Sequence, residues 1–126
     1  MKNLSIALMV LAILAGCAMS GMESGVTLAA ARTGDRVMLT LHNGSAAPVG
    51  YNLCSSGLQR ATGGSWEAIE TGDVCTMEIR TLDPGASATF EKTLPAGLPS
   101  GEYRYATNID AGETRTIAIS NPFRVE

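Results

Sequence analysis

The chain is predicted to fold as one all-β domain, an antiparallel β-sandwich. Three observations support this prediction: apolar and polar residues alternate along most of the chain, turn-forming residues recur at short intervals, and residues 25–126 hold no convincing stretch of helical period. About eight or nine short strands in roughly 100 residues are typical of a sandwich or a small barrel. The total of 126 residues leaves room for a single such domain.

The first two predicted strands, residues 26–30 and 36–42, are joined by a turn at residues 33–35. Because the side chains of a strand point alternately to its two faces, one face of the second strand should be buried. His42 lies on the other face and is expected to point to solvent. The residues expected inside are Val37, Leu39 and Leu41.

A loop at residues 43–48 precedes a third predicted strand, which begins at Val49. Residues 58–61 and 66–69 are then predicted to form a hairpin, because the two glycines between them supply the positive φ that a tight turn needs. The residues of the third strand that share a face are Val49, Tyr51 and Leu53.

Another strand is predicted to open at Cys75, with Met77 and Ile79 alternating with charged residues. Residues 83–85, Asp-Pro-Gly, should form a turn, because proline presets φ and glycine accepts the position that follows. The residues that can face inward beyond this turn are Ala88 and Phe90.

The last quarter of the chain completes the predicted set of strands. Residues 95–101 contain two prolines and two glycines and cannot be a central strand. They lead into a predicted strand at residues 103–109. A strand at residues 116–119 alternates isoleucine with threonine and alanine, and Pro122 separates it from a final strand at residues 123–125.

The first 24 residues are assigned to export rather than to the fold. Lys2 followed by the apolar stretch 4–14 has the order of a signal peptide, and this stretch is shorter than the roughly 20 residues of a transmembrane helix. We therefore divide the chain into three parts. These are a helical signal peptide at residues 1–16, a flexible linker at residues 17–24 and the folded domain at residues 25–126.

The residues that end the signal peptide, Leu14-Ala15-Gly16-Cys17, resemble the lipobox of bacterial lipoproteins. The resemblance implies that Cys17 carries a diacylglycerol and an additional fatty acid such as palmitate. These lipid groups anchor the chain to a membrane of the cell envelope. Ala18 follows the cysteine, and in enterobacteria-like sorting this favours the outer membrane. An ordinary secretory signal, in which Cys17 has no lipid, is the alternative.

Composition argues against several functional classes. Nine basic residues face twelve acidic ones, and no run of Lys or Arg offers the basic stripe that nucleic-acid binding needs. His42 is the single histidine and no Gly-x-Ser-x-Gly motif is present, so we predict that the protein is not an enzyme. No clustered set of ligands indicates a metal or a cofactor.

The two cysteines of the domain, Cys54 and Cys75, are predicted to form a disulfide, because an even number of thiols in an oxidising compartment normally pairs. The bridge would enclose the predicted hairpin, a region with little apolar surface to bury. Metal binding is one alternative, although no Cys-x-x-Cys is present. Two buried free thiols are the other.

Four segments carry a resemblance to a family: Trp66, residues 82–85, residues 98–104 and residues 120–125. Together they resemble the small immunoglobulin-like domains of bacterial lipoproteins. The resemblance implies an immunoglobulin-like antiparallel β-sandwich. It also identifies Tyr103 with a tyrosine corner, whose hydroxyl bonds to the backbone a few residues upstream. A buried aromatic residue without that bond is the alternative for Tyr103.

These observations predict a membrane-anchored extracytoplasmic lipoprotein that acts as a non-catalytic binding or structural module of the cell envelope. The predicted partners are the membrane, reached through the lipid on Cys17, and a protein whose identity the sequence does not reveal. The alternative is a protease inhibitor, because intracellular inhibitor domains of bacilli share this kind of pattern. The loops at residues 43–50 and 95–101 are the predicted contact surfaces.

Overall fold

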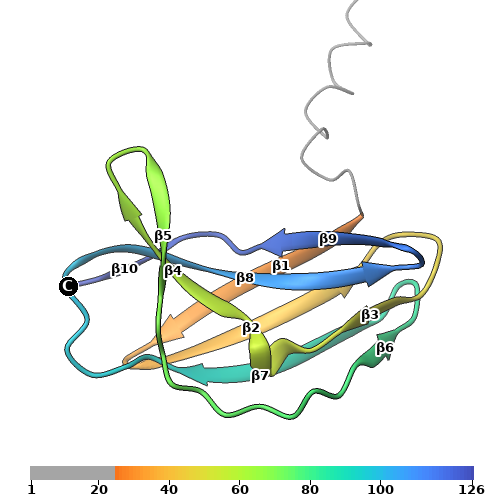
Figure 1. Cartoon of the computed structure of the whole chain (residues 1–126), viewed down its shortest axis with the longest axis horizontal. Helices are drawn as coiled ribbons and strands as arrows, with labels where there is room; N and C mark the ends of the chain where they lie inside the picture. The colour runs from red at the N-terminus through yellow and green to blue at the C-terminus, as the bar shows by residue number, and fades with distance from the viewer. Residues whose placement is uncertain (1–24) are drawn as a thin grey trace, which may run out of the picture.

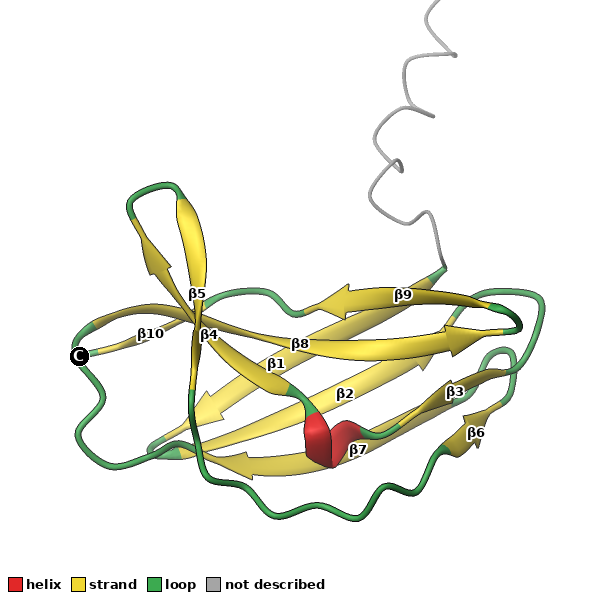
Figure 2. Cartoon of the chain, viewed as in Figure 1, coloured by secondary structure: helices red, strands yellow, loops and turns green. Residues whose placement is uncertain are grey.

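The computed structural model describes residues 25–126, which form a sandwich of two antiparallel β-sheets (Figure 1). The described part of the chain contains ten strands and one 3₁₀ turn, and it has no α-helix (Figure 2). The predicted all-β sandwich is therefore confirmed. The predicted signal peptide, linker and lipidation site lie outside the described residues. Within residues 25–126, no helix is long and apolar enough to cross a membrane.

The smaller sheet has three strands in the order β1-β2-β7. Their bounds are β1 (Val26–Thr33), β2 (Arg36–Asn43) and β7 (Ser87–Thr93). The first two form a hairpin that pairs Thr33 with Arg36. Between them Gly34 has a φ of 65°, a left-handed conformation that glycine adopts without strain.

The larger sheet is built around the long strand β8 (Gly101–Ala111). One edge of β8 pairs with β4 and β3, and its other edge pairs with β9 and β10. β5 extends the sheet from β4, and β6 extends it from β3. Their bounds are β3 (Val49–Tyr51), β4 (Gly57–Thr62), β5 (Ser65–Ile69), β6 (Arg80–Leu82), β9 (Thr114–Ile119) and β10 (Phe123–Val125). A 3₁₀ turn, Leu53–Ser55, separates β3 from β4.

This arrangement matches the strand order of an immunoglobulin-like sandwich. In such domains strands A, B and E lie in one sheet and strands C, F and G in the other. Here β1, β2 and β7 take the first set of places. The broken strand β3/β4, the central β8 and the broken strand β9/β10 take the second set.

The core lies between the two sheets and confirms the alternation predicted for β2. Val37, Leu39 and Leu41 are completely buried, whereas His42 is exposed. The largest buried side chains come from β8, where Tyr103 and Tyr105 point between the sheets. Residues one position away from these face outward, as the period of a strand requires.

Two predicted turns are confirmed by their backbone conformation. In the β4–β5 hairpin, Gly63 and Gly64 have φ values of 58° and 96°, which suit a tight two-residue turn. In the turn before β7, the amide of Ala86 donates to the carbonyl of Asp83 at 3.0 Å. Gly85 has a φ of 82° in this turn, a conformation that other residues rarely adopt.

The connection from β7 to β8 contains the predicted tyrosine corner. Tyr103 is fully buried, and its hydroxyl donates a hydrogen bond to the carbonyl oxygen of Pro99 at 2.6 Å. This bond fixes the irregular segment 95–100 against the first residues of β8.

The prediction of a strand that begins at Cys75 is wrong. Regular pairing begins only at Arg80, the first residue of β6, and residues 70–79 form neither strand nor helix. Met77 and Ile79 are 92% and 58% exposed, so neither contributes a buried face. The segment lies at the open edge between the two sheets, where side-chain bonds and a disulfide hold it without a partner strand.

Phe90 faces inward as predicted, because it pairs with the buried Leu39, but its side chain is still 38% exposed. β7 is an edge strand. The next residue of β7 that points inward is Lys92, which is only 4% exposed. In β9 the alternation is present, but the buried side belongs to Ala118. Ile117 and Ile119 therefore lie on the outer surface of the larger sheet, 56% and 46% exposed.

Candidate functional site

The segment of residues 70–79, which we call the strap, joins β5 to β6 along the open edge of the sandwich. In Figure 1 it runs along one edge of the sandwich, below β7, and ends at β6. A cavity of about 470 Å³ adjoins the strap, and its lining includes Val74 from the strap, Tyr51 from β3 and Phe90 from β7. The strap is therefore fixed at particular points and is not packed along its whole length.

A disulfide fixes the middle of the strap. Cys75 is bonded to Cys54 in the 3₁₀ turn, which confirms the predicted pair. The bridge encloses the β4–β5 hairpin, which projects from the sandwich (Figure 2). Next to the bridge, the side-chain amide of Asn52 donates to the carbonyl oxygen of Thr76 at 2.8 Å. Two consecutive residues of the strap are thus held to the segment that follows β3.

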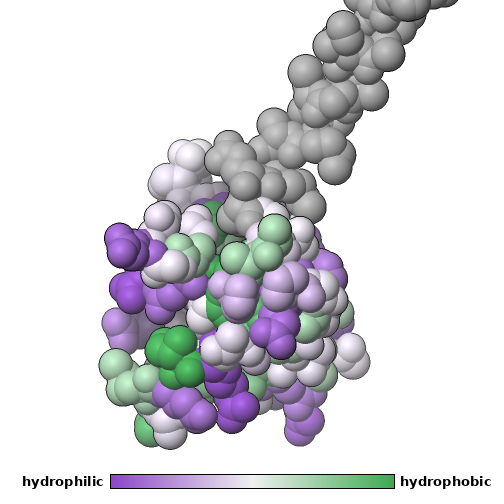
Figure 3. Space-filling view, turned by 90° about the vertical axis from the view of Figure 1, so that its right-hand side faces the viewer, coloured by the Kyte–Doolittle hydropathy of each residue, from purple (hydrophilic) through white to green (hydrophobic). Residues whose placement is uncertain are grey.

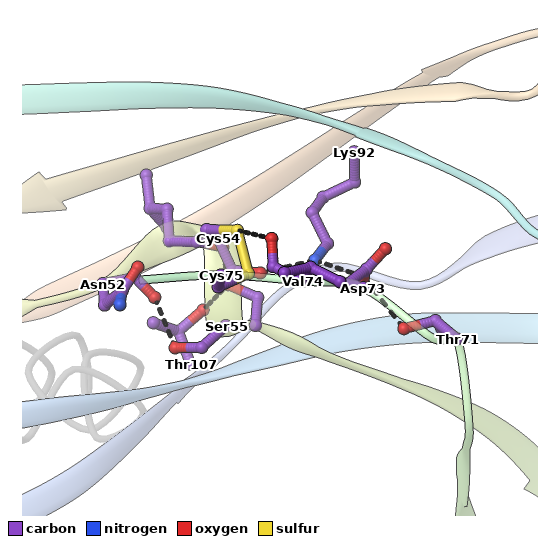
Figure 4. A network of polar contacts seen from close by, with 11 residues as sticks. Asn52, Cys54, Ser55, Thr71, Asp73, Val74, Cys75, Lys92 and Thr107 are labelled. Carbon is purple, nitrogen blue, oxygen red and sulfur yellow. Dashed lines mark hydrogen bonds and ion pairs between the residues drawn. A yellow bond between two sulfur atoms is a disulfide. The ribbon is translucent and has the colours of Figure 1, made fainter. Parts of the chain in front are cut away.

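A buried lysine fixes the strap a second time. Lys92 extends from β7 into the interior, and its Nζ donates to the carbonyl oxygen of Cys54 at 2.7 Å and to Oδ2 of Asp73 at 2.8 Å. Figure 4 shows this ammonium group between the disulfide and Asp73, whose carboxylate also accepts a bond from the hydroxyl of Thr71. A buried charge is costly unless it is paired, so the fold requires Asp73 at this place.

The charges of this cluster affect two titrations. The hydrogen bond from the Lys92 ammonium group is the main reason why the pKa of Asp73 is lower than its ordinary value. Burial, with a smaller contribution from the negative charge of Asp73, raises the pKa of Tyr105 to about 12. The ring of Tyr105 lies 5.9 Å from Nζ of Lys92. Lys92 therefore lies close to both groups whose pKa is shifted.

The strap presents apolar side chains to solvent although its backbone is fixed. Val74 and Met77 are 94% and 92% exposed, the highest values among the large hydrophobic residues described. Ile79 is partly covered because it lies over Gly50, where a Cβ atom would come within 2.9 Å of Cγ2 of the isoleucine. Within the described chain, the backbone N–H groups of residues 74–78 make no hydrogen bond. Side chains and N–H groups on this segment are both free to contact another molecule.

The other residues singled out from the sequence are His42, which the structure describes, and Cys17. His42 lies on the outer face of β2, where its Nδ1 is 2.9 Å from the hydroxyl oxygen of Ser87. Residues 25–126 contain no group of three or more His, Cys, Asp and Glu side chains that could hold a metal ion. Cys17 lies outside the described residues.

The two loops predicted as contact surfaces are fastened to the domain. In loop 43–50, the buried side chain of Asn43 donates to the carbonyl oxygens of Ala47 and Leu82, both at 2.9 Å. Loop 95–101 contains the acceptor of the tyrosine corner. Figure 3 looks onto the end of the domain that lies on the right in Figure 1, and there hydrophobic colour occurs in separate spots among hydrophilic residues.

Sequence reasoning missed the strap and the lysine that holds it. The alternation around Met77 is typical of a strand, and the sequence does not show that the partner strand is absent. Lys92 could have been found from its register, because it is two positions from Phe90 on the face of β7 that points inward. The pairing of Lys92 with Asp73 could not have been found from the sequence, because this contact depends on the path of the strap.

Comparisons with known proteins agree with the fold. No protein-family model and no curated protein matches the chain. Among solved structures, the X-ray structure of Northeast Structural Genomics Consortium target SoR45 is similar, with a TM-score of 0.58. The likeness covers 82% of this chain and 88% of that one at 13% sequence identity, so it concerns the fold alone.

Proposed function

We propose that the protein is a non-catalytic binding module of the cell envelope, anchored by lipid on Cys17, and that it contacts a protein partner through the strap. The observation that carries this proposal is the near-complete exposure of Val74 and Met77 on a backbone fixed by a disulfide and by the ion pair between Asp73 and the buried Lys92. Exposed apolar side chains reduce solubility, so their presence favours a surface that a partner covers. A segment that is already fixed loses little conformational entropy when it binds, which also favours binding.

The binding part of the proposal is tested with a photo-crosslinking residue placed at Met77 in cells that make the protein. The matched control carries the same residue at Met38, which is 40% exposed and lies in the smaller sheet. We expect an adduct of defined mass at position 77 alone, and excess wild-type protein should suppress it. Excess protein with Val74→Ser and Met77→Ser should not. Equal labelling at positions 38 and 77, or suppression by both competitors, would contradict this role of the strap.

The anchoring part of the proposal is tested separately by labelling cells with radioactive palmitate. The lipobox resemblance predicts label in the wild type and none in the Cys17→Ser variant. The variant should also leave the membrane fraction. Equal incorporation into both proteins would show that Cys17 is not the site of acylation.

A further inference from the structure

Resting on the proposed binding function, we propose that the partner contributes an extended segment of its backbone, which adds to the free edge of β7 as a new edge strand of the smaller sheet. The segment runs antiparallel to β7, and its apolar side chains enter the cavity that adjoins the strap. The partner is therefore a protein with an exposed strand or an extended segment in which apolar and polar residues alternate.

The hydrogen-bond register of β7 shows which of its backbone groups face away from the sheet. At the two ends of the β2–β7 ladder, the N–H of Asn43 donates to the carbonyl oxygen of Ala86 at 3.0 Å, and the N–H of Leu94 donates to that of Asp35 at 2.7 Å. The direction of the backbone groups alternates along an antiparallel strand, so the even-numbered residues of β7 bond to β2 and the odd-numbered ones point to the open edge. The odd-numbered residues are Ser87, Thr89, Glu91 and Thr93.

The free edge of β7 has the charge pattern of an unpaired strand. Within residues 25–126, the N–H and C=O groups of these four residues make no hydrogen bond, and all four residues are exposed. A donor with a partial positive charge lies beside an acceptor with a partial negative charge at every second residue, roughly 7 Å apart along the strand. Another extended backbone has the complementary charges at the same spacing, whereas a small ligand or a lipid does not.

The opposite edge of the same sheet is closed. The side-chain amide of Asn121 donates to the carbonyl oxygen of Ala30 at 3.0 Å and accepts from the N–H of Ala30 at 2.9 Å, so it takes the place of a neighbouring strand on β1. The guanidinium group of Arg32 also donates to the carbonyl oxygen of Arg124 at 2.9 Å. Proteins protect such edges because an open edge pairs with other chains. No side chain of the described residues closes the edge of β7 in this way.

The inward face beside the free edge also lacks cover. Phe90 of β7 pairs with the fully buried Leu39, yet Phe90 itself is 38% exposed. The cavity of about 470 Å³ adjoins Phe90, and Tyr51 and Val74 line the same cavity. An antiparallel strand beside β7 places every second side chain on this inward face. Apolar residues at those positions would cover the ring of Phe90, and polar residues at the alternate positions would face solvent.

Thr89 allows the pairing to be broken without disturbing the rest of the sheet. Its N–H points to the open edge, so Thr89→Pro removes a donor there and leaves the ladder to β2 complete. Thr89→Ala is the matched control, because it removes the same side chain and keeps the N–H group. Both variants should protect the amides of β2 from hydrogen exchange as the wild type does.

The probe is a synthetic peptide in which threonine alternates with valine over the length of β7, with a lysine at each end for solubility. The full chain is used in detergent, and fluorescence anisotropy of the labelled peptide measures binding. We expect saturable binding to the wild type and to Thr89→Ala, and at least about tenfold weaker binding to Thr89→Pro. The bound peptide should also slow hydrogen exchange at the odd-numbered residues of β7.

Two N-methylated peptides test the direction of the pairing. In the antiparallel arrangement the valines point inward and their N–H groups point away from β7, whereas the threonine N–H groups face β7. Methylation of every valine nitrogen should change the affinity by less than about threefold, and methylation of every threonine nitrogen should abolish binding. Any other pattern, or equal binding of the peptide by the wild type and Thr89→Pro, overturns the inference.

The cross-link at Met77 separates a failure of this inference from a failure of the proposed binding function. In cells, Thr89→Pro should remove the adduct that forms at position 77, and Thr89→Ala should keep it. An adduct that survives Thr89→Pro would leave the binding function standing and overturn the role of the β7 edge. The absence of any adduct in the wild type would remove the binding function and the inference that rests on it. Sedimentation of the purified chain supplies the last measurement, because a dimer that Thr89→Pro abolishes would assign the edge to a second copy and overturn the inference.

Discussion

Replacing Cys54 and Cys75 with serine should lower the free energy of unfolding by about 3 kcal/mol. The two residues are 21 positions apart, and the entropy of closing a loop of that length in the unfolded chain corresponds to roughly 3.3 kcal/mol at 25 °C. For a domain of this size such a loss should lower the Tm by about 12–24 °C. Total stabilities of small domains are about 5–15 kcal/mol, so the variant should still fold.

The assay is urea unfolding followed by circular dichroism, with limited proteolysis of the native protein as a second readout. The control is the wild type after reduction and alkylation, which should lose a similar stability. The strap should also become much more sensitive to protease, because only Lys92 and Asn52 still hold it. A variant within about 1 kcal/mol of the wild type, with the strap still resistant, would refute the view that the disulfide is the main support.

Three further predictions concern the tyrosines and the ion pair between Lys92 and Asp73. Tyr103→Phe should lower the free energy of unfolding by about 1–3 kcal/mol, because the carbonyl of Pro99 loses its hydrogen-bond donor. Urea unfolding measures this change, and an unchanged midpoint would contradict the role of the tyrosine corner. In a spectrophotometric titration one phenol should ionise near pH 12, and Tyr105→Phe should remove this ionisation step. If the step is still present in the variant, it belongs to another tyrosine. Because the folded pKa of Asp73 is lowered, its contribution to stability is present above its ordinary pKa of 3.8 and is lost as the pH falls through the lowered value. The difference in unfolding free energy between wild type and Asp73→Asn should therefore shrink toward acid pH, and a constant difference from about pH 6 to about pH 2 would oppose this account.

The parts of the fold that could be predicted are those set by local rules. The burial of Val37, Leu39 and Leu41 follows from the period of a strand, and the hairpin at residues 63 and 64 follows from the φ values that glycine allows. The disulfide followed from the number of cysteines. Each of these features depends on a few neighbouring residues or on composition.

The parts that could not be predicted depend on which strand lies beside which. Met77 and Ile79 alternate as in a strand, yet the chain at this point crosses the gap between two sheets and finds no partner. Phe90 has the expected orientation, but its place on an edge strand leaves it partly exposed. Lys92 is buried because Asp73 reaches it from a segment 19 residues away in sequence. These outcomes are properties of the assembled sandwich.

The bond between Cys54 and Cys75 also makes the binding element sensitive to the surroundings in which the chain folds. In a reducing compartment the two sulfur atoms remain thiols, and the strap keeps only its non-covalent contacts. The sandwich can assemble there, because its core does not include the bridge. There the strap would present Val74 and Met77 on a less constrained segment, which would lose more conformational entropy when it binds.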